Sequence, residues 1–140
     1  MKNLMHIEQE LKDNDTALSQ SHEALWNGTQ WYQEATKETA VYPQEPTDTA
    51  LSYLSLGLAS EAGEVAGKVK KWLRGDYNEM PNGADHSTRD IKAEMGDVFW
   101  YLSELCNHLK LDMQDVMEDN IRKLRYRAAS NTIKGDGDVR

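Results

Sequence analysis

The chain is poor in helix breakers, in cysteine and in long hydrophobic runs. Only three prolines and one phenylalanine occur among its 140 residues, which favours long helices over a strand-rich fold. The single cysteine, Cys106, cannot form a disulfide within the chain, and we interpret it as a packing residue in a reducing cytoplasm. No run of about 18 apolar residues is present, and the first residues lack the apolar segment of a signal peptide. These absences predict one all-α domain, located in the cytoplasm, with no membrane contact.

Positive charge is also scarce. The chain has 16 lysines and arginines but 24 aspartates and glutamates, which gives a formal net charge of -8 at pH 7. A general nucleic-acid surface needs clustered basic side chains to replace counterions, so we expect no nucleic-acid partner. An anionic substrate would be repelled as well. A nucleotide is expected to approach only where divalent ions and local lysines reverse the sign of the charge.

A long amphipathic helix is predicted at residues 47–74, with Thr47 as N-cap and Gly75 as left-handed C-terminal cap. Its apolar residues recur at intervals of three and four and so share one face: Leu51, Leu54, Leu58, Val65, Val69 and Trp72. Glu61 lies in this stripe, and Glu64 follows one turn later. Because an isolated carboxylate is expensive to bury, we expect a cation beside this pair.

A second helix, predicted at residues 88–110 with a capping box at Ser87 and Asp90, repeats this arrangement. Its apolar stripe contains Ile91, Met95, Val98, Leu102, Leu105 and Leu109. Glu94 lies at the edge of the stripe, and Asp97 follows it by three residues. If the two stripes pack together, four carboxylates converge and raise one another's pKa unless a cation lies between them. Such all-oxygen ligands suit magnesium, manganese or calcium rather than zinc. The alternative is that each acidic pair is simply a solvated helix face.

Glycines inside the two predicted helices support the interpretation of the acidic pairs as a cation site. Each costs about 1 kcal/mol relative to alanine in a helix, so it is tolerated mainly where a backbone or ligand comes close. Gly57, Gly63 and Gly67 lie on the first helix and Gly96 on the second. Gly63 and Gly96 each stand between the two acids of a pair.

Basic and polar residues near the acidic pairs form a second candidate set. Lys68 and Lys71 lie one and two turns beyond Glu64, either as phosphate contacts or as helix-end cations that favour the dipole. After a loop at residues 76–86, the second acidic helix and a tight turn, Asp112 is the predicted N-cap of a further helix. One face of that helix carries Asn120, Lys123 and Arg127, which could equally be a solvated stripe, with Lys123 paired to Asp119.

The ends of the chain are less informative. Residues 1–27 predict a surface helix or an arm that packs on a partner subunit. A helix is expected from about residue 28 until shortly before Pro43, and residues 129–140 predict an irregular tail. The chain is therefore expected to consist of an arm at 1–27, a helical catalytic domain at 28–128 and a flexible tail at 129–140.

The acidic pairs resemble the motifs of a known family. Glu-Ala-Gly-Glu at 61–64 and Glu-Met-Gly-Asp at 94–97 resemble the paired ExxE and ExxD motifs of the MazG-like all-α nucleoside triphosphate pyrophosphohydrolases. The resemblance extends over roughly residues 30–140, through Tyr32-Gln33, Thr39, Tyr42-Pro43, residues 120–124, Arg127 and the closing residues 135–140. It implies a four- to five-helix bundle that associates as a homodimer or a dimer of dimers.

The same resemblance implies hydrolysis of a (deoxy)nucleoside triphosphate to the monophosphate and pyrophosphate, for cleansing or control of the nucleotide pool. It implies Mg²⁺, with Mn²⁺ as a substitute, held by the catalytic residues Glu61, Glu64, Glu94 and Asp97. Of these carboxylates, we select Glu64 as the general base. It also implies phosphate contacts from Lys68, Lys71, Asn120, Lys123 and Arg127. The alternative is a non-catalytic metal- or nucleotide-binding helical scaffold. A ferritin-type redox bundle is not expected, because neither acidic helix carries the ExxH pair that such bundles use.

Overall fold

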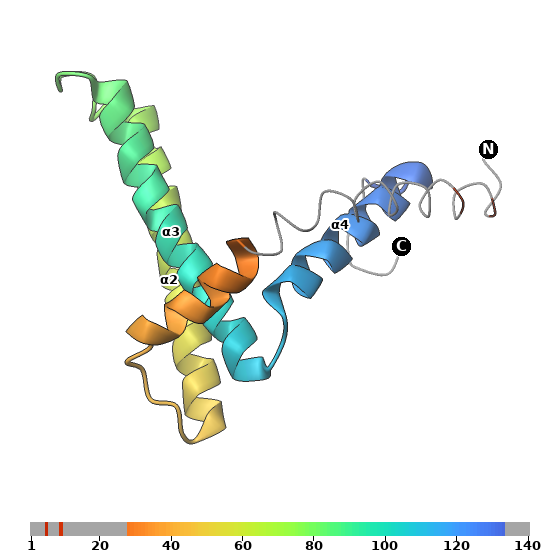
Figure 1. Cartoon of the computed structure of the whole chain (residues 1–140). Coiled ribbons are helices and arrows are strands. Elements are labelled where there is room, and N and C mark those ends of the chain that lie inside the picture. The colour runs from red at the N-terminus through yellow and green to blue at the C-terminus, as the bar shows by residue number, and fades with distance from the viewer. Residues whose placement is uncertain (1–4, 6–8, 10–27, 134–140) are drawn as a thin grey trace. The chain divides into compact units, whose positions relative to one another are not determined.

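The regular elements of the chain are helices. The computed structural model describes residues 5, 9 and 28–133, and no strand occurs among them (Figure 1). Residues 28–36 are helical and continue into a 3-10 turn, η1 (Lys37–Thr39); the long helices are α2 (Thr47–Arg74), α3 (Gly83–Leu109) and α4 (Met113–Ala129). The predicted all-α fold class is confirmed. Most of residues 1–27 and of the tail lie outside the described residues, so the predictions for these two segments stay predictions.

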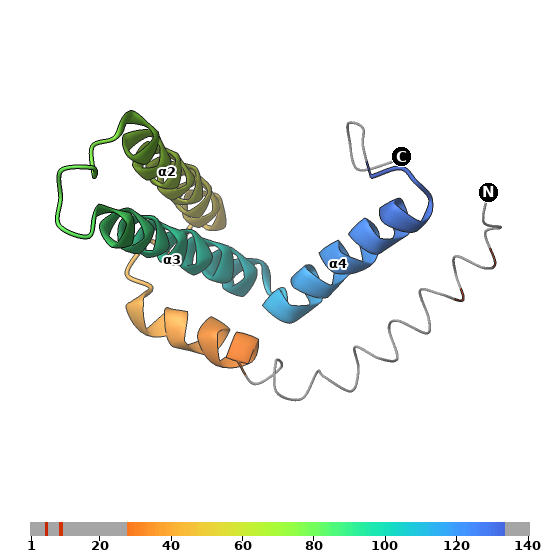
Figure 2. The ribbon, with the colours of Figure 1, turned by 90° about the horizontal axis from the view of Figure 1, so that it is seen from above.

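The described residues fall into two compact units. One unit is Gln33–Lys110, and the described part of the other contains residues 28–32 and 111–133, including α4. Within the first unit α2 and α3 lie side by side as an antiparallel hairpin, with residues 75–82 between them (Figures 1 and 2). The predicted antiparallel pairing of the two acidic helices is therefore confirmed. The packing of α4 against this hairpin stays a prediction.

Helix α2 has the predicted bounds, but its N-cap differs by one residue. Pro46 occupies the N-cap position, and its carbonyl accepts hydrogen bonds from the backbone N–H groups of Thr49 (2.9 Å) and Ala50 (3.3 Å). Thr47 is the first helical residue, so its prediction as N-cap is wrong. At the other end Gly75 has φ 86°, and its N–H donates to the Trp72 carbonyl at 3.0 Å. The predicted left-handed glycine cap is confirmed.

Helix α3 begins at Gly83, five residues before the predicted start. Ser87 is not a cap, because its hydroxyl donates to the Ala84 carbonyl at 2.9 Å inside the helix. Asp90, the other half of the predicted capping box, accepts a hydrogen bond from Tyr77 at 3.2 Å. A Cβ on Gly83 would clash with the Tyr77 carbonyl, so this position requires glycine. The loop predicted at residues 76–86 therefore ends at Asn82, and its last residues belong to α3.

The apolar stripes of α2 and α3 are only partly covered. Leu54 and Ala50 are fully buried beside Tyr42, which is 6% exposed, and Trp100, Tyr101 and Leu105 pack against them. Trp72, which was assigned to the buried stripe, is 52% exposed. On α3, three of the predicted stripe residues are exposed: Met95, Leu102 and Leu109. A hairpin of two helices can bury only the sides that face each other, so it leaves apolar surface exposed.

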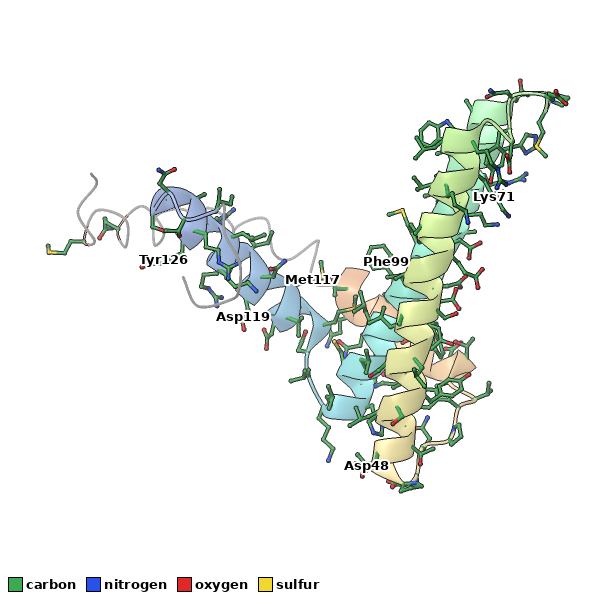
Figure 3. All side chains as sticks on the ribbon, turned by 180° about the vertical axis from the view of Figure 1, so that it is seen from behind. Asp48, Lys71, Phe99, Met117, Asp119 and Tyr126 are labelled. Atoms are coloured by element: carbon green, nitrogen blue, oxygen red, sulfur yellow. The ribbon has the colours of Figure 1, made fainter. Side chains whose placement is uncertain are left out.

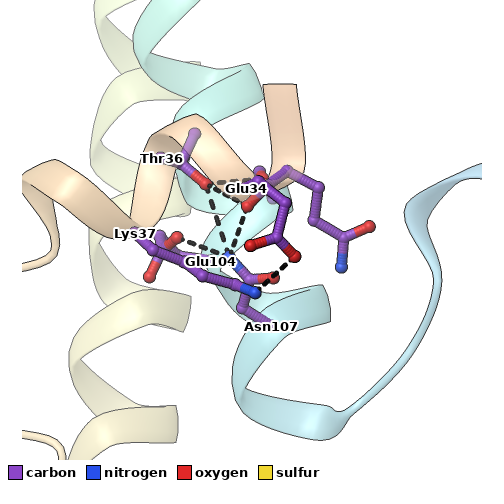
Figure 4. Close-up of polar contacts among 7 residues, drawn as sticks. Glu34, Thr36, Lys37, Glu104 and Asn107 are labelled. Carbon is purple, nitrogen blue, oxygen red and sulfur yellow. Dashed lines mark hydrogen bonds and ion pairs between the residues drawn. The ribbon is translucent and has the colours of Figure 1, made fainter. Parts of the chain in front are cut away.

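A buried polar network attaches the segment before α2 to α3 (Figure 4). Glu104 is 1% exposed and accepts hydrogen bonds from the Tyr42 hydroxyl at 3.0 Å and the Asn107 amide at 2.7 Å. The hydroxyls of Thr36 and Ser103 lie 2.9 Å apart, and the Asn107 amide also donates to the Gln33 carbonyl at 3.0 Å. These hydrogen bonds satisfy polar groups that would be costly to bury alone.

Helix α4 begins as predicted. The Asp112 side chain accepts a hydrogen bond from the Gln114 N–H at 2.7 Å, with Asp112 in an extended conformation. The N-cap prediction is confirmed, because this bond satisfies one of the free N–H groups of the first turn.

Gly57 of α2 lies against the side chain of Tyr101 on α3. A Cβ at this position would clash with the ring of Tyr101, whereas a Cβ on Gly67 meets no atom within 4 Å. We expect Gly57→Ala to lower the free energy of unfolding by about 1–3 kcal/mol through overpacking. Gly67→Ala, the matched control, should raise it by about 0.5–1 kcal/mol because alanine favours the helix. Chemical denaturation measures both values, and equal effects of the two variants would contradict the assigned clash.

Candidate active site

Three carboxylates from two helices converge at the middle of the hairpin. One oxygen each from Glu61 on α2 and from Glu94 and Asp97 on α3 lie within 4.8 Å of one another. Glu61 and Glu94 are half-buried and Asp97 is exposed, so the group opens to solvent on one side. The antiparallel hairpin creates this arrangement because it sets the centre of α2 beside the centre of α3. We call Glu61, Glu94 and Asp97 the acidic cluster.

Glu64 acts on the acidic cluster from outside it. It is exposed on α2, one turn beyond Glu61, and is not part of the group within 4.8 Å. The pKa of the Glu61 carboxyl is raised first by partial burial and then by the negative charges of three neighbours: Glu64, Asp97 and Glu94. The four predicted carboxylates thus lie close enough to influence one another, but three of them form the closest group.

The residues of the acidic cluster fit a hard divalent cation. They offer oxygen ligands only, which suits Mg²⁺ or Mn²⁺ better than zinc. The pKa of Glu61 is raised mainly by burial and further by the charges of Glu64, Asp97 and Glu94, and a bound cation would offset both effects. A Cβ on Gly63 or Gly96 would meet no atom within 4 Å, so no neighbouring backbone accounts for these two glycines.

Lys68 contacts the acidic cluster directly. Its Nζ lies 3.1 Å from Oε1 of Glu94 and 4.0 Å from Oδ2 of Asp90. The hydrogen bond to Glu94 is the main cause that raises the pKa of the Lys68 ammonium. Asp90 is itself held by the Tyr77 hydroxyl at 3.2 Å and by Arg89 at 3.3 Å. The sequence predicted Lys68 near the acidic face, and the structure shows that Glu94 is its carboxylate partner.

The other predicted phosphate contacts differ in their surroundings. Lys71 is exposed toward the loop end of the hairpin (Figure 3). The pKa of Asp76 there is lowered mainly by its hydrogen bond with Arg74, and the charge of Lys71 lowers it further. On α4, in the other unit, Asn120 and Lys123 are exposed whereas Arg127 is 6% exposed. Asp119, the alternative partner considered for Lys123, forms an ion pair with Arg122. The roles of these residues toward phosphate stay predictions.

Tyr101 and Glu104 on α3 were not among the site residues predicted from the sequence. Tyr101 lies close enough that Glu61 and Asp97 contribute to the raised pKa of its hydroxyl, after burial and the interaction with Tyr53. Glu104 is the buried carboxylate of the polar network. A signal for both was present, because Tyr101 and Glu104 follow Asp97 by four and seven residues and so share its helical face.

Aromatic rings connect the acidic cluster to the polar network. Tyr53 stacks on Tyr42 with ring centroids 5.7 Å apart, and it lies 6.5 Å from Tyr101. Trp100 meets Tyr101 edge to face at 4.9 Å and Tyr42 at 6.3 Å. This packing holds the Tyr101 side of α3 against α2, which fixes the distance between Glu61 and Asp97.

The all-α hairpin thus brings together Glu61 of the ExxE sequence and both acids of the ExxD sequence. Residues 49–130 match the model of the MazG nucleotide pyrophosphohydrolase domain, and the chain belongs to this family. It is also similar to the Gene 37 protein of Mycobacterium phage L5, with 39% identity over 112 residues that cover 78% of this chain and 96% of that protein. No solved structure matches the chain. The family is generally dependent on divalent metals.

Proposed function

We propose that the protein hydrolyses a (deoxy)nucleoside triphosphate to the monophosphate and pyrophosphate, with Mg²⁺ as cofactor and Mn²⁺ as a substitute. The observation that carries the proposal is the convergence of Glu61, Glu94 and Asp97 from two helices within 4.8 Å. A family match over residues 49–130 supports the reaction class. Removal of non-standard nucleotides or control of the deoxynucleotide pool is the role that this reaction would serve.

The side chains of the site divide into metal ligands and groups that act on substrate. Glu61, Glu94 and Asp97 would hold the metal, which supplies charge neutralisation of the triphosphate and a more acidic water. Glu64, exposed one turn away, would complete the metal ligands or accept the proton of the attacking water as general base. Lys68 and Lys71 would offset charge on the phosphate oxygens, because phosphoryl transfer depends mainly on positioning and electrostatics.

The substrate-binding roles of Asn120, Lys123 and Arg127 on α4, and a catalytic domain of residues 28–128, are also part of the proposal. Asn120 and Lys123 are exposed and would contact phosphate oxygens of the substrate. Arg127, which is buried, would support these contacts from within its own unit.

A homodimer or a dimer of dimers is part of the proposal. Helix α3 carries exposed apolar residues at intervals of four, three and seven: Met95, Phe99, Leu102 and Leu109. Phe99 projects from the side of the hairpin (Figure 3). Apolar stripes of this kind mark interfaces. A sedimentation mass of one chain would contradict the assembly.

The proposed setting is the cytoplasm, with no nucleic-acid or membrane partner. Among the described residues, no helix combines the length and the hydrophobicity that crossing a membrane requires.

A pyrophosphate-release assay tests the proposed reaction. The intact protein is incubated with a panel of standard, deoxy and modified nucleoside triphosphates, with Mg²⁺, with Mn²⁺ and with a chelator. We expect monophosphate and pyrophosphate in equal amounts, and only when metal is present. The ranking of bases then identifies the substrate. Metal binding without turnover of any triphosphate would instead favour a non-catalytic scaffold.

A further inference from the structure

We infer that Lys68 is an internal counter-ion that competes with the divalent metal for Glu94 and passes to the triphosphate when the metal binds. The Lys68 ammonium lies 3.1 Å from a Glu94 oxygen, and Glu94 belongs to the acidic cluster. In this position the lysine neutralises a carboxylate that the metal also needs. The inference rests on the proposed function, because it assigns a further property to the same site.

The ion pair between Lys68 and Glu94 is partly buried. The side chains of Lys68 and Glu94 are 25% and 13% exposed, so solvent screens their attraction only in part. A divalent cation at Glu94 would lie close to the ammonium and repel it. The metal must therefore break an existing ion pair before it gains Glu94 as a ligand, and this lowers its affinity.

Asp90 keeps the released lysine beside the site. It lies 4.0 Å from the Lys68 ammonium, one helical turn before Glu94 on α3. The hydroxyl of the buried Tyr77 donates to Asp90 at 3.2 Å and holds this carboxylate in place. Lys68 can therefore leave Glu94 without leaving the hairpin. A triphosphate that arrives with the metal would find a free ammonium at the edge of the acidic cluster.

This exchange couples the two ligands. Metal binding frees the lysine for the phosphates, and phosphate binding holds the lysine away from Glu94. Each ligand therefore raises the affinity for the other by the same factor, as linkage requires. Removal of the lysine should separate the two effects, because metal alone binds more tightly while the phosphate chain binds less tightly.

The affinity for Mn²⁺ without nucleotide, measured by electron paramagnetic resonance, tests the competition. We expect Lys68→Met to bind Mn²⁺ about fivefold more tightly than the unmodified chain, because the metal no longer has to break the ion pair at Glu94. Lys70→Met is the matched control, since Lys70 is exposed on the same helix and carries the same charge. Its affinity should change less than twofold, because an exposed charge is screened over about 8–10 Å. Circular dichroism confirms that each variant is folded.

The outcomes separate this inference from the proposed function. Saturable Mn²⁺ binding that is equal in Lys68→Met and Lys70→Met overturns the competition and leaves the metal site intact. No saturable binding in any of the three proteins overturns both the metal site and the inference. A second titration uses inorganic tripolyphosphate at saturating Mg²⁺, where Lys68→Met should bind about fivefold more weakly than Lys70→Met. Equal tripolyphosphate affinity overturns the transfer of the lysine to phosphate.

Discussion

Glu61→Gln is expected to reduce metal-dependent turnover at least 1000-fold and, at the same time, to make the metal-free protein more stable. The loss follows from removal of a ligand at the centre of the acidic cluster, because a misplaced metal forfeits several kcal/mol of transition-state stabilisation and about 1.4 kcal/mol corresponds to each tenfold in rate. The gain follows from the removal of a charge whose pKa is raised by burial and by Glu64, Asp97 and Glu94. Relief of such repulsion is worth about 0.5 kcal/mol.

Glu94→Gln is the informative comparison for Glu61→Gln. It should impair turnover to a similar extent, but it removes the partner of Lys68 rather than an uncompensated charge. We therefore expect Glu94→Gln to leave the free energy of unfolding unchanged or to lower it by about 1 kcal/mol. Steady-state kinetics and urea denaturation of the two variants measure these effects. Near-normal turnover of Glu61→Gln would remove Glu61 from the site, and equal stability changes would contradict the assigned charge environments.

The second large effect is stabilisation by divalent metal. A ligand that binds only the folded state adds about 2.7 kcal/mol at a concentration 100 times its dissociation constant. For a chain of this size that corresponds to an increase of about 10 °C in the midpoint of thermal unfolding. We expect this increase with Mg²⁺ or Mn²⁺ at pH 7. Glu61→Gln is the control and should show a much smaller one.

The metal effect should depend on pH in a defined direction. The pKa of Glu61 is raised in the folded state, so the folded protein retains a proton that the unfolded chain loses near its ordinary value of 4.5. Without metal, this group therefore favours folding below that value, and its contribution is lost as pH rises through the raised pKa. Metal must displace the same proton, so its stabilising effect grows with pH over the same interval. Thermal melts at acidic and neutral pH, with and without metal, measure both trends. An equal metal effect at both pH values would contradict the role of Glu61.

The positions of α2 and of the carboxylates along the chain follow from local sequence alone. Apolar spacing, Pro46 before the helix and Gly75 after it are sufficient to define residues 47–74, because helix periodicity and end signals act over a few residues. The same periodicity places Glu61 and Glu64 on one helix and Glu94 and Asp97 on the other with known spacing. The pairing of the helices as an antiparallel hairpin followed from burial of the two apolar stripes.

Only the tertiary structure decided which of these groups meet. It brought Glu61 together with Glu94 and Asp97, left Glu64 outside that group, and paired Lys68 with Glu94. In the tertiary structure the apolar Trp72 is exposed and the charged Glu104 is buried, the reverse of what their residue types suggest. Such distances depend on how far each helix is rotated about its axis and shifted along its neighbour. Packing between residues far apart in sequence sets these two quantities, as the contact of Tyr101 with Gly57 does here, and the spacing within one helix does not contain them.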